Sequence, residues 1–145
     1  MTNTSRSLSH WKANHSLVTI IGIILNLCLA VPLLLWPGWI LTLFGIPVAN
    51  LIWPRFAGGL LIILSVFYAP IILDLNRFRI LAWFQIFPSR MFGALFFLGA
   101  VVIFGAPAGF LVGTLIDGSI AILALFCLIR VVGLEQDIAT GRADT

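Results

Sequence analysis

Long apolar stretches make up most of this chain, and short segments richer in polar residues, proline or glycine separate them. Four stretches, at residues 17–36, 55–73, 88–105 and 108–132, each approach the roughly 20 residues that cross the roughly 30 Å hydrocarbon core of a bilayer. In lipid, a single segment satisfies its own backbone hydrogen bonds only as a helix. The pattern therefore predicts an all-α fold, an integral membrane four-helix bundle in which residues 1–145 form one membrane domain.

The basic residues distinguish the two ends of the predicted bundle. Seven of the eight fall at the end that carries both termini, and Arg55 alone falls at the other. Because cytoplasmic loops carry an excess of Lys and Arg, we expect both termini to be cytoplasmic. The seven residues are Arg6, Lys12, Arg77, Arg79, Arg90, Arg130 and Arg142.

Composition fits a protein whose main partner is the lipid bilayer. Hydrophobic residues make up 61% of the chain and charged residues 9%, which leaves too little polar surface for a water-soluble globule. All five tryptophans fall near predicted membrane surfaces, the layer that indole rings prefer. The sequence pI of about 9.5 does not indicate nucleic acid as a partner, because the positive charges gather where anionic lipid headgroups lie.

Both long connections keep an apolar character. The first, residues 37–54, is expected to form short helical turns in the outer interface or to cover the mouth of the bundle. The second joins a polar patch, residues 74–79, to an apolar piece, residues 80–87. We expect this second segment to lie in the cytoplasmic interface, with its arginines near lipid phosphate.

Residues suited to redox or metal chemistry are sparse. Cys28 and Cys127 lie in different spans, and His10 and His15 both precede the first span. We therefore expect no paired-cysteine chemistry, no bis-histidine haem, no metal and no other cofactor. An enzyme is disfavoured, because one acid in the membrane without a paired base or nucleophile offers little chemistry.

Asp117 is the most distinctive polar residue, because it falls near the middle of the fourth predicted span. An ionisable side chain at that depth costs about 2.5–3.5 kcal/mol on insertion scales. Asp117 continues a row of small residues that includes Gly109, Gly113 and Ala121, the kind of face on which helices approach closely. We expect its carboxyl group to face protein or water.

Polar residues of other spans fall at similar depths. They are Asn26 in the first span, Ser65 and Tyr68 in the second, and Thr114 one turn before Asp117. We predict that these side chains form one polar cluster with Asp117. Three roles remain open for the cluster. A hydrogen bond to the carboxyl group fixes helix register, or the carboxyl group exchanges a proton or holds the polar end of an amphiphile, or the cluster contacts a partner subunit.

The second and third spans begin alike, with an arginine followed three residues later by a glycine: Arg55 with Gly58, and Arg90 with Gly93. The small residues leave room for a close neighbour. Arg55 on the outer side and Arg90 on the cytoplasmic side are each either an anchor to lipid headgroups or an anion contact at the mouth of a pocket.

These two helix starts, together with Asp117 in the last span, resemble small bacterial membrane proteins of the DoxX-like kind over most of residues 17–132. The resemblance implies a four-helix protein of the bacterial inner membrane. From the better-known members it also implies an accessory membrane subunit beside a redox enzyme. Other residues in the pattern are Trp53, Pro54, Tyr68, Asp74, Arg77 and Arg79.

The function most favoured by the sequence is that of a non-catalytic accessory or scaffolding subunit, with other membrane subunits or a second copy as partner. Such a role needs small-residue faces for neighbouring helices, and Gly58, Gly93, Gly109 and Gly113 offer them. The alternative is a binder or transporter of a small hydrophobic or amphiphilic molecule, such as a lipid or a quinone. In that alternative the cluster around Asp117 holds the polar group, and the outer connection acts as a lid.

Overall fold

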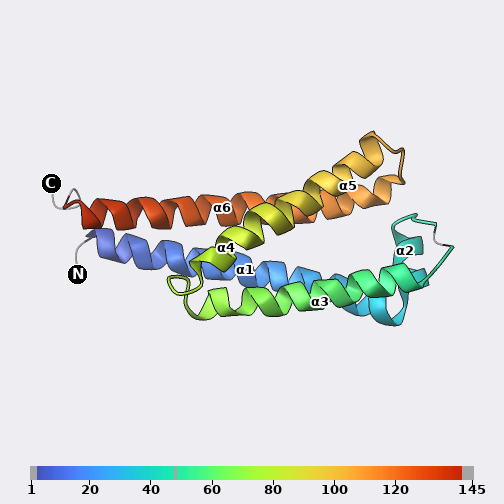
Figure 1. The fold of residues 1–145 in the computed structure, drawn as a ribbon, viewed down its shortest axis with the longest axis horizontal. Coiled ribbons are helices and arrows are strands. Elements are labelled where there is room, and N and C mark those ends of the chain that lie inside the picture. Colours follow the sequence, from blue (N-terminus) through green and yellow to red (C-terminus); the bar gives the residue numbers. More distant parts are fainter. Residues whose placement is uncertain (1–2, 48, 142–145) are drawn as a thin grey trace.

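The fold is known from a computed structural model that describes residues 3–47 and 49–141. Within these ranges every regular element is a helix, which confirms the all-α prediction. Four helical segments of the described chain are long and apolar enough to cross a membrane: Thr4–Leu35, Ile52–Leu73, Arg79–Val102 and Ala108–Ala139. They pack as a helical bundle (Figure 1).

The first two membrane-length helices form an antiparallel hairpin. Helix α1 (Asn3–Leu35) is followed by the short helix α2 (Pro37–Leu43), and α3 (Ile52–Leu73) returns along α1. Gly58 lets the two backbones approach, since a Cβ atom at this position would lie 2.8 Å from the carbonyl oxygen of Ala30. Helix α2 provides the short helical turn expected in the outer connection.

The third membrane-length segment begins earlier than the sequence suggested. Helix α4 (Arg79–Phe84), the π-helix η1 (Gln85–Met91) and α5 (Phe92–Val102) follow one another without a break. We expected a helix start near residue 88 and an interfacial segment over residues 80–87, because Pro88 lacks a donor and usually ends or begins a helix. Instead the helix widens to the π form around Pro88 and continues.

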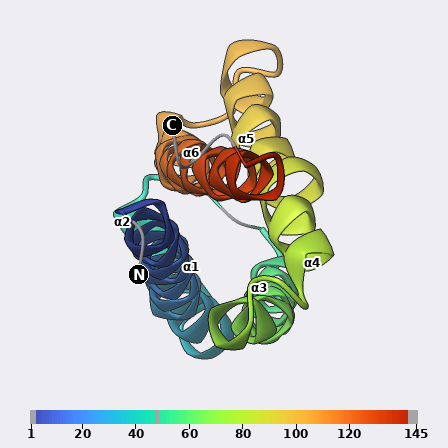
Figure 2. The same cartoon turned by 90° about the vertical axis from the view of Figure 1, so that its left-hand side faces the viewer.

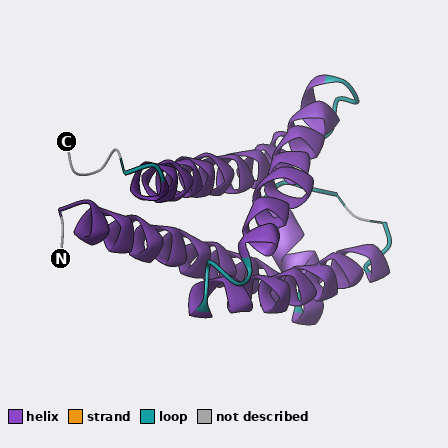
Figure 3. Ribbon diagram, turned by 60° about the vertical axis from the view of Figure 1, so that its left-hand side comes forward, coloured by secondary structure: helices purple, strands orange, loops and turns teal. Residues whose placement is uncertain are grey.

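The last helix, α6 (Leu111–Ala139), follows a single 3₁₀ turn, η2 (Ala108–Phe110). It packs against α1, η1 and α5, while α3 contacts α1 and α4, so the helices surround a shared interior (Figure 2). Helix α5 leans away from α3 and packs on α6 (Figure 3). The start of α1 and the end of α6 lie at the same end of the bundle (Figure 1).

At that end both α1 and α6 are longer than the spans expected from hydropathy, because each helix continues into a polar segment. An ion pair joins the two extensions, with Lys12 Nζ 2.8 Å from Glu135 Oε1. A second connects the start of α4 to the same carboxylate, with Arg79 Nη2 2.6 Å from Glu135 Oε2. We call Lys12, Arg79 and Glu135 the charged end of the bundle.

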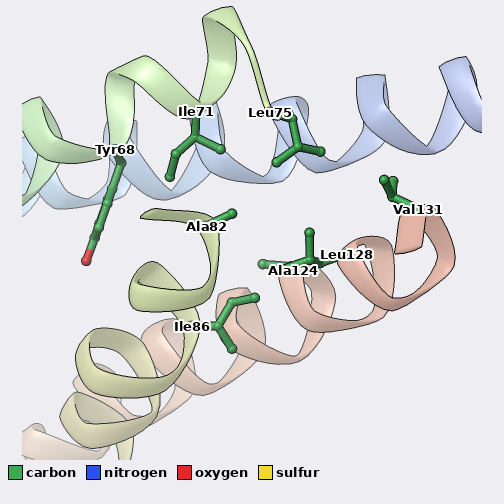
Figure 4. Close-up of a cluster of buried hydrophobic side chains, with 8 residues drawn as sticks. All are labelled: Tyr68, Ile71, Leu75, Ala82, Ile86, Ala124, Leu128 and Val131. Atoms are coloured by element: carbon green, nitrogen blue, oxygen red, sulfur yellow. The ribbon is translucent and has the colours of Figure 1, made fainter. Parts of the chain in front are cut away.

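Apolar side chains both fill the interior of the bundle and cover its surface, as in an integral membrane protein. A buried cluster of eight residues joins α3 and the turn after it to α4, η1 and α6 (Figure 4). Large apolar side chains elsewhere on the helices, such as Val66, Leu115 and Ile122, are exposed. Apolar helices with such a surface are in contact with the lipid bilayer, so this is a multi-pass membrane protein. The cluster comprises Tyr68, Ile71, Leu75, Ala82, Ile86, Ala124, Leu128 and Val131.

Candidate functional site

A largely buried ion pair connects two of the membrane-length segments. Arg90 of η1 donates through Nη1 to Oδ1 of Asp117 in α6, at 2.6 Å. The arginine side chain is 2% exposed and the aspartate side chain 23%. Charges at such a position are stable only when they are paired and hydrogen-bonded, because desolvation of each ion costs several kcal/mol.

Two glycines make room for this pair. The second guanidinium nitrogen of Arg90, Nη2, donates to the carbonyl oxygen of Gly22 in α1 at 3.0 Å. A Cβ atom on Gly22 would lie 2.9 Å from that nitrogen, and one on Gly93 in α5 would lie 2.5 Å from Oδ2 of Asp117. Side chains at either position would therefore displace the pair. The ion pair joins α1, η1 and α6 at one point.

The π-helix explains how Arg90 comes to share a buried face with Gln85. In an α-helix, residues five apart point about 140° away from each other. The wider π turn pairs residues five apart along the helix and is frequent at functional sites. Both Gln85 and Arg90 are buried in η1.

Tyr68 of α3 lies beside the pair. The Arg90 guanidinium carbon lies 5.8 Å from the centre of the Tyr68 ring, within the range of a cation–π contact. The hydroxyl group of Tyr68 is hydrogen-bonded to that of Ser89. This bond connects α3 to η1 next to the charged residue.

Tyr68 and Ser89 also line an open cleft of about 330 Å³ between α3 and the α4–η1 segment. We call it the α3–α4 cleft. Its other walls are apolar, and exposed Phe67 and Phe84 flank it. The cleft therefore opens on the apolar outer surface, with polar groups at one place in its lining. The lining residues are Leu64, Phe67, Tyr68, Leu81, Phe84, Pro88 and Ser89.

A second set of buried polar groups lies between the ion pair and the charged end. His15 and Thr19 of α1 and Gln85 of η1 are all 0% exposed. Thr19 Oγ1 donates to the His15 carbonyl oxygen at 3.0 Å and lies 3.4 Å from Gln85 Oε1. Neither ring nitrogen of His15, nor Nε2 of Gln85, has a hydrogen-bond partner in the part of the chain that the structure describes.

The structure brings together only part of the predicted polar cluster. Asp117 is paired with Arg90, which we had placed at the cytoplasmic face and which is instead buried within the bundle. Tyr68 is adjacent through its ring and hydroxyl contacts. Thr114 donates to the carbonyl oxygen of Ala94 at 3.3 Å, and so links α6 to α5 without contacting the carboxyl group.

Three predicted site residues stand apart from the pair. Ser65 is buried, but its hydroxyl group donates to the Leu61 carbonyl oxygen of its own helix at 2.8 Å. Asn26 is buried and makes no side-chain hydrogen bond among the residues described. Arg55 is exposed near the start of α3 and forms no ion pair within the described ranges.

Sequence reasoning missed His15, Thr19, Gln85 and Ser89. A signal for the first two existed, because His15, Thr19, Gly22 and Asn26 recur at spacings of four, three and four, which places them on one helix face. We had placed His15 before the first span, whereas α1 is continuous from Asn3 to Leu35. Gln85 and Ser89 were assigned to an interfacial connection and to a helix start.

The site therefore offers one largely buried charge pair, a hydrogen-bonded pair of hydroxyl groups on residues that line a cleft, and one imidazole. Among the described residues no group of three or more His, Cys, Asp or Glu side chains could hold a metal ion. Both cysteines are free thiols, Cys28 exposed and Cys127 buried. These groups can donate hydrogen bonds, balance charge and move protons.

No family model, no curated protein and no solved structure matches the chain. The fold and the lipid-compatible surface define a class: a small multi-pass membrane protein built from four membrane-length apolar helices. The DoxX-like resemblance stays a prediction.

Proposed function

We propose that the protein binds a small amphiphilic molecule of the bilayer in the α3–α4 cleft. One observation carries this proposal: an apolar cleft on the outer surface is lined by Tyr68 and Ser89, whose hydroxyl groups are hydrogen-bonded to each other beside buried Arg90. Small-molecule sites combine apolar walls with a few placed polar groups in this way. The ligand's apolar part lies along the walls and its polar group meets the hydroxyl pair.

The hydroxyl pair favours a ligand that accepts hydrogen bonds. When one hydroxyl group of Tyr68 and Ser89 donates to the other, a single hydroxyl hydrogen is left for a third group. A carbonyl oxygen, as in a quinone or an acyl lipid, suits that donor. The volume of about 330 Å³ is near the lower end for ligand pockets and fits a ring or a headgroup with its chain left in lipid.

That the protein is an accessory subunit stays a prediction, but the glycines that favoured it make close contacts within the chain itself. Gly58 packs on α1, Gly93 on Asp117, Gly109 on Phe44 and Gly113 on Phe97. These close approaches occur inside the chain. A partner subunit is therefore not needed to account for the small-residue rows.

Photolabelling tests the proposal. The full-length protein in lipid vesicles is labelled with a diazirine-bearing fatty acid, with and without an excess of the unlabelled acid, and the modified peptides are identified by mass spectrometry. We expect competable labelling to concentrate on the peptides that line the α3–α4 cleft. Leu81→Trp, which fills the cleft, is expected to reduce competable labelling about tenfold, the loss that corresponds to about 1.4 kcal/mol of binding.

A matched variant separates filling of the cleft from a general effect of tryptophan. Leu60 lies on the exposed face of α3, outside the cleft lining, so Leu60→Trp is expected to keep competable labelling at the wild-type level. The proposal would be contradicted if the label were spread evenly over the lipid-facing helices and if both variants were labelled equally. A stoichiometric second protein in native mass spectrometry of the gently extracted complex would support the accessory-subunit reading instead.

A further inference from the structure

Several buried polar side-chain atoms have no hydrogen-bond partner in the described chain. Within the described chain they are both ring nitrogens of His15, Nε2 of Gln85, and the Nε atoms of Arg79 and Arg90. Buried polar groups in folded proteins nearly always have partners, and internal water satisfies those that protein groups do not. A histidine held only for packing is expected to satisfy at least one ring nitrogen with a protein partner, and His15 satisfies neither. This arrangement is typical of a hydrated polar path.

We propose that His15, Thr19 and Gln85 form a proton path between the charged end of the bundle and Asp117. The proposal concerns proton access to the ion pair and does not depend on what occupies the α3–α4 cleft. Its function is to let the carboxyl group of Asp117 exchange protons with one side of the membrane.

The contacts place the members of the path in order. Lys12 of the charged end precedes His15 by three residues on α1 and is paired with Glu135. Thr19 lies one turn beyond His15 and approaches Gln85, and Gly22 lies one turn further and accepts from Arg90. At 1.5 Å per residue, the distance from His15 to Gly22 along α1 is about 10 Å. The proposed path requires water molecules, held by the Thr19 hydroxyl and the Gln85 amide, over that length.

The chemistry needs no co-reactant beyond water. A hydronium ion at the charged end gives a proton to one ring nitrogen of neutral His15 and becomes water, and the N–H bond at the other nitrogen breaks, which leaves the imidazole neutral in its other tautomer. The released proton passes through water to a carboxylate oxygen of Asp117, where an O–H bond forms. Arg90 keeps its charge, and its guanidinium group stays hydrogen-bonded to the neutral carboxyl group and to the Gly22 carbonyl oxygen. The reverse steps return the proton.

The charged and titratable groups on the elements packed around His15 have both signs. Lys12 and the exposed His10 lie on its own helix, Arg79 and Arg90 on α4 and η1, and Tyr68 on α3; α6 carries Asp117, Cys127, Arg130, Glu135 and the exposed Asp137. Asp117 and Glu135 are each ion-paired with at least one of these bases, and Arg130 lies over the Trp11 ring. The His15 ring is fully buried and neither of its nitrogens has a hydrogen-bond partner in the described chain.

Infrared difference spectroscopy after a pH jump tests the path in the full-length protein in lipid vesicles. The carbonyl stretch of a protonated carboxyl group reports on Asp117, and its absence in Asp117→Asn assigns the band. We expect His15→Leu to slow the appearance of this band about a hundredfold, the lower end of what a positioned proton-transfer group contributes. The pH midpoint of the band is expected to stay unchanged, because a relay alters a rate and not an equilibrium.

Two further variants complete the design. His10→Leu removes an exposed histidine of the same helix and is expected to leave the rate unchanged. His15→Gln keeps a polar side chain that does not titrate, and it is expected to be as slow as His15→Leu, so it serves if the leucine variant does not fold. An unchanged rate in the folded His15 variants would overturn the proposal. So would a shifted midpoint without slowing, or the lack of any band that depends on Asp117.

Discussion

At the scale of single residues, the ion pair of Arg90 and Asp117 balances two charges that are buried to different extents. The guanidinium group is almost completely enclosed, whereas the carboxylate retains part of its exposure. Desolvation therefore weighs more heavily on the arginine once its partner is removed. The hydrogen bond from Arg90 to the Gly22 carbonyl oxygen relieves a part of this cost but does not neutralise the charge.

This difference predicts an unequal response to mutation. Asp117→Leu leaves an enclosed unpaired cation and is expected to lower the free energy of unfolding by about 3–5 kcal/mol. Arg90→Leu leaves a partly exposed carboxylate that can take up a proton, so its loss is expected to be smaller. The double variant, in which no charge remains, is expected to lie closer to wild type than either single variant.

Reversible unfolding in mixed detergent micelles, followed by circular dichroism, measures these three variants against wild type. Leu60→Met, a conservative change on the exposed face of α3, is the control for the assay and is expected to be neutral. Strictly additive losses in the double variant would show that the two side chains do not stabilise each other.

At the scale of elements, the distance between two helices depends on residues whose effect comes from contacts with another helix. Gly58 and Gly59 are neighbours in sequence but differ in surroundings. A Cβ atom on Gly58 would meet the Ala30 carbonyl oxygen at 2.8 Å, and a Cβ atom on Gly59 would meet nothing within 4 Å. The first glycine sets the distance between α1 and α3, and the second faces open space.

Alanine substitutions distinguish these two positions. Gly58→Ala is expected to destabilise the bundle by about 1–3 kcal/mol, because a rigid backbone carbonyl cannot give way to the added methyl group. Gly59→Ala is expected to be neutral or to stabilise by up to about 1 kcal/mol, since alanine favours the helix. The same micelle unfolding measurement compares them. Equal effects at the two positions would contradict the packing of α3 on α1 through Gly58.

The sequence predicted correctly those helices that follow from the length of an apolar stretch. It predicted poorly those helix boundaries that depend on packing between helices. Four membrane-length helices follow from apolar length, because lipid allows a single segment hardly any other form. The start of the third segment does not follow from apolar length. Pro88 locally indicates the start of a helix, whereas in the structure a π-helix runs through Pro88. Once that start was placed at residue 88, Arg90 was assigned to a surface and its pairing with Asp117 could not be foreseen.

At the scale of the whole molecule, polar sequence is concentrated at one end of the bundle. The extended ends of α1 and α6 meet there, with Lys12, Arg79 and Glu135 in contact. Arg90 no longer counts among the basic residues of a connection, because it is buried within the bundle. Arg77 and Arg79 still lie near the turn between α3 and α4, so the charge asymmetry that predicts a cytoplasmic location for this end persists without Arg90.

Single cysteines test that orientation in a background with Cys28→Ala and Cys127→Ala. Ala49→Cys lies in the exposed connection before α3, and Thr140→Cys lies at the exposed end of α6. In intact cells, a membrane-impermeant thiol reagent is expected to label position 49 at once and position 140 only after permeabilisation, since the positive-inside rule places the charged end in the cytoplasm. The reverse labelling pattern would show that the bundle has the opposite orientation in the membrane. It would also place the mouth of the proposed proton path on the outer side, so that His15 would deliver protons to Asp117 from outside the cell.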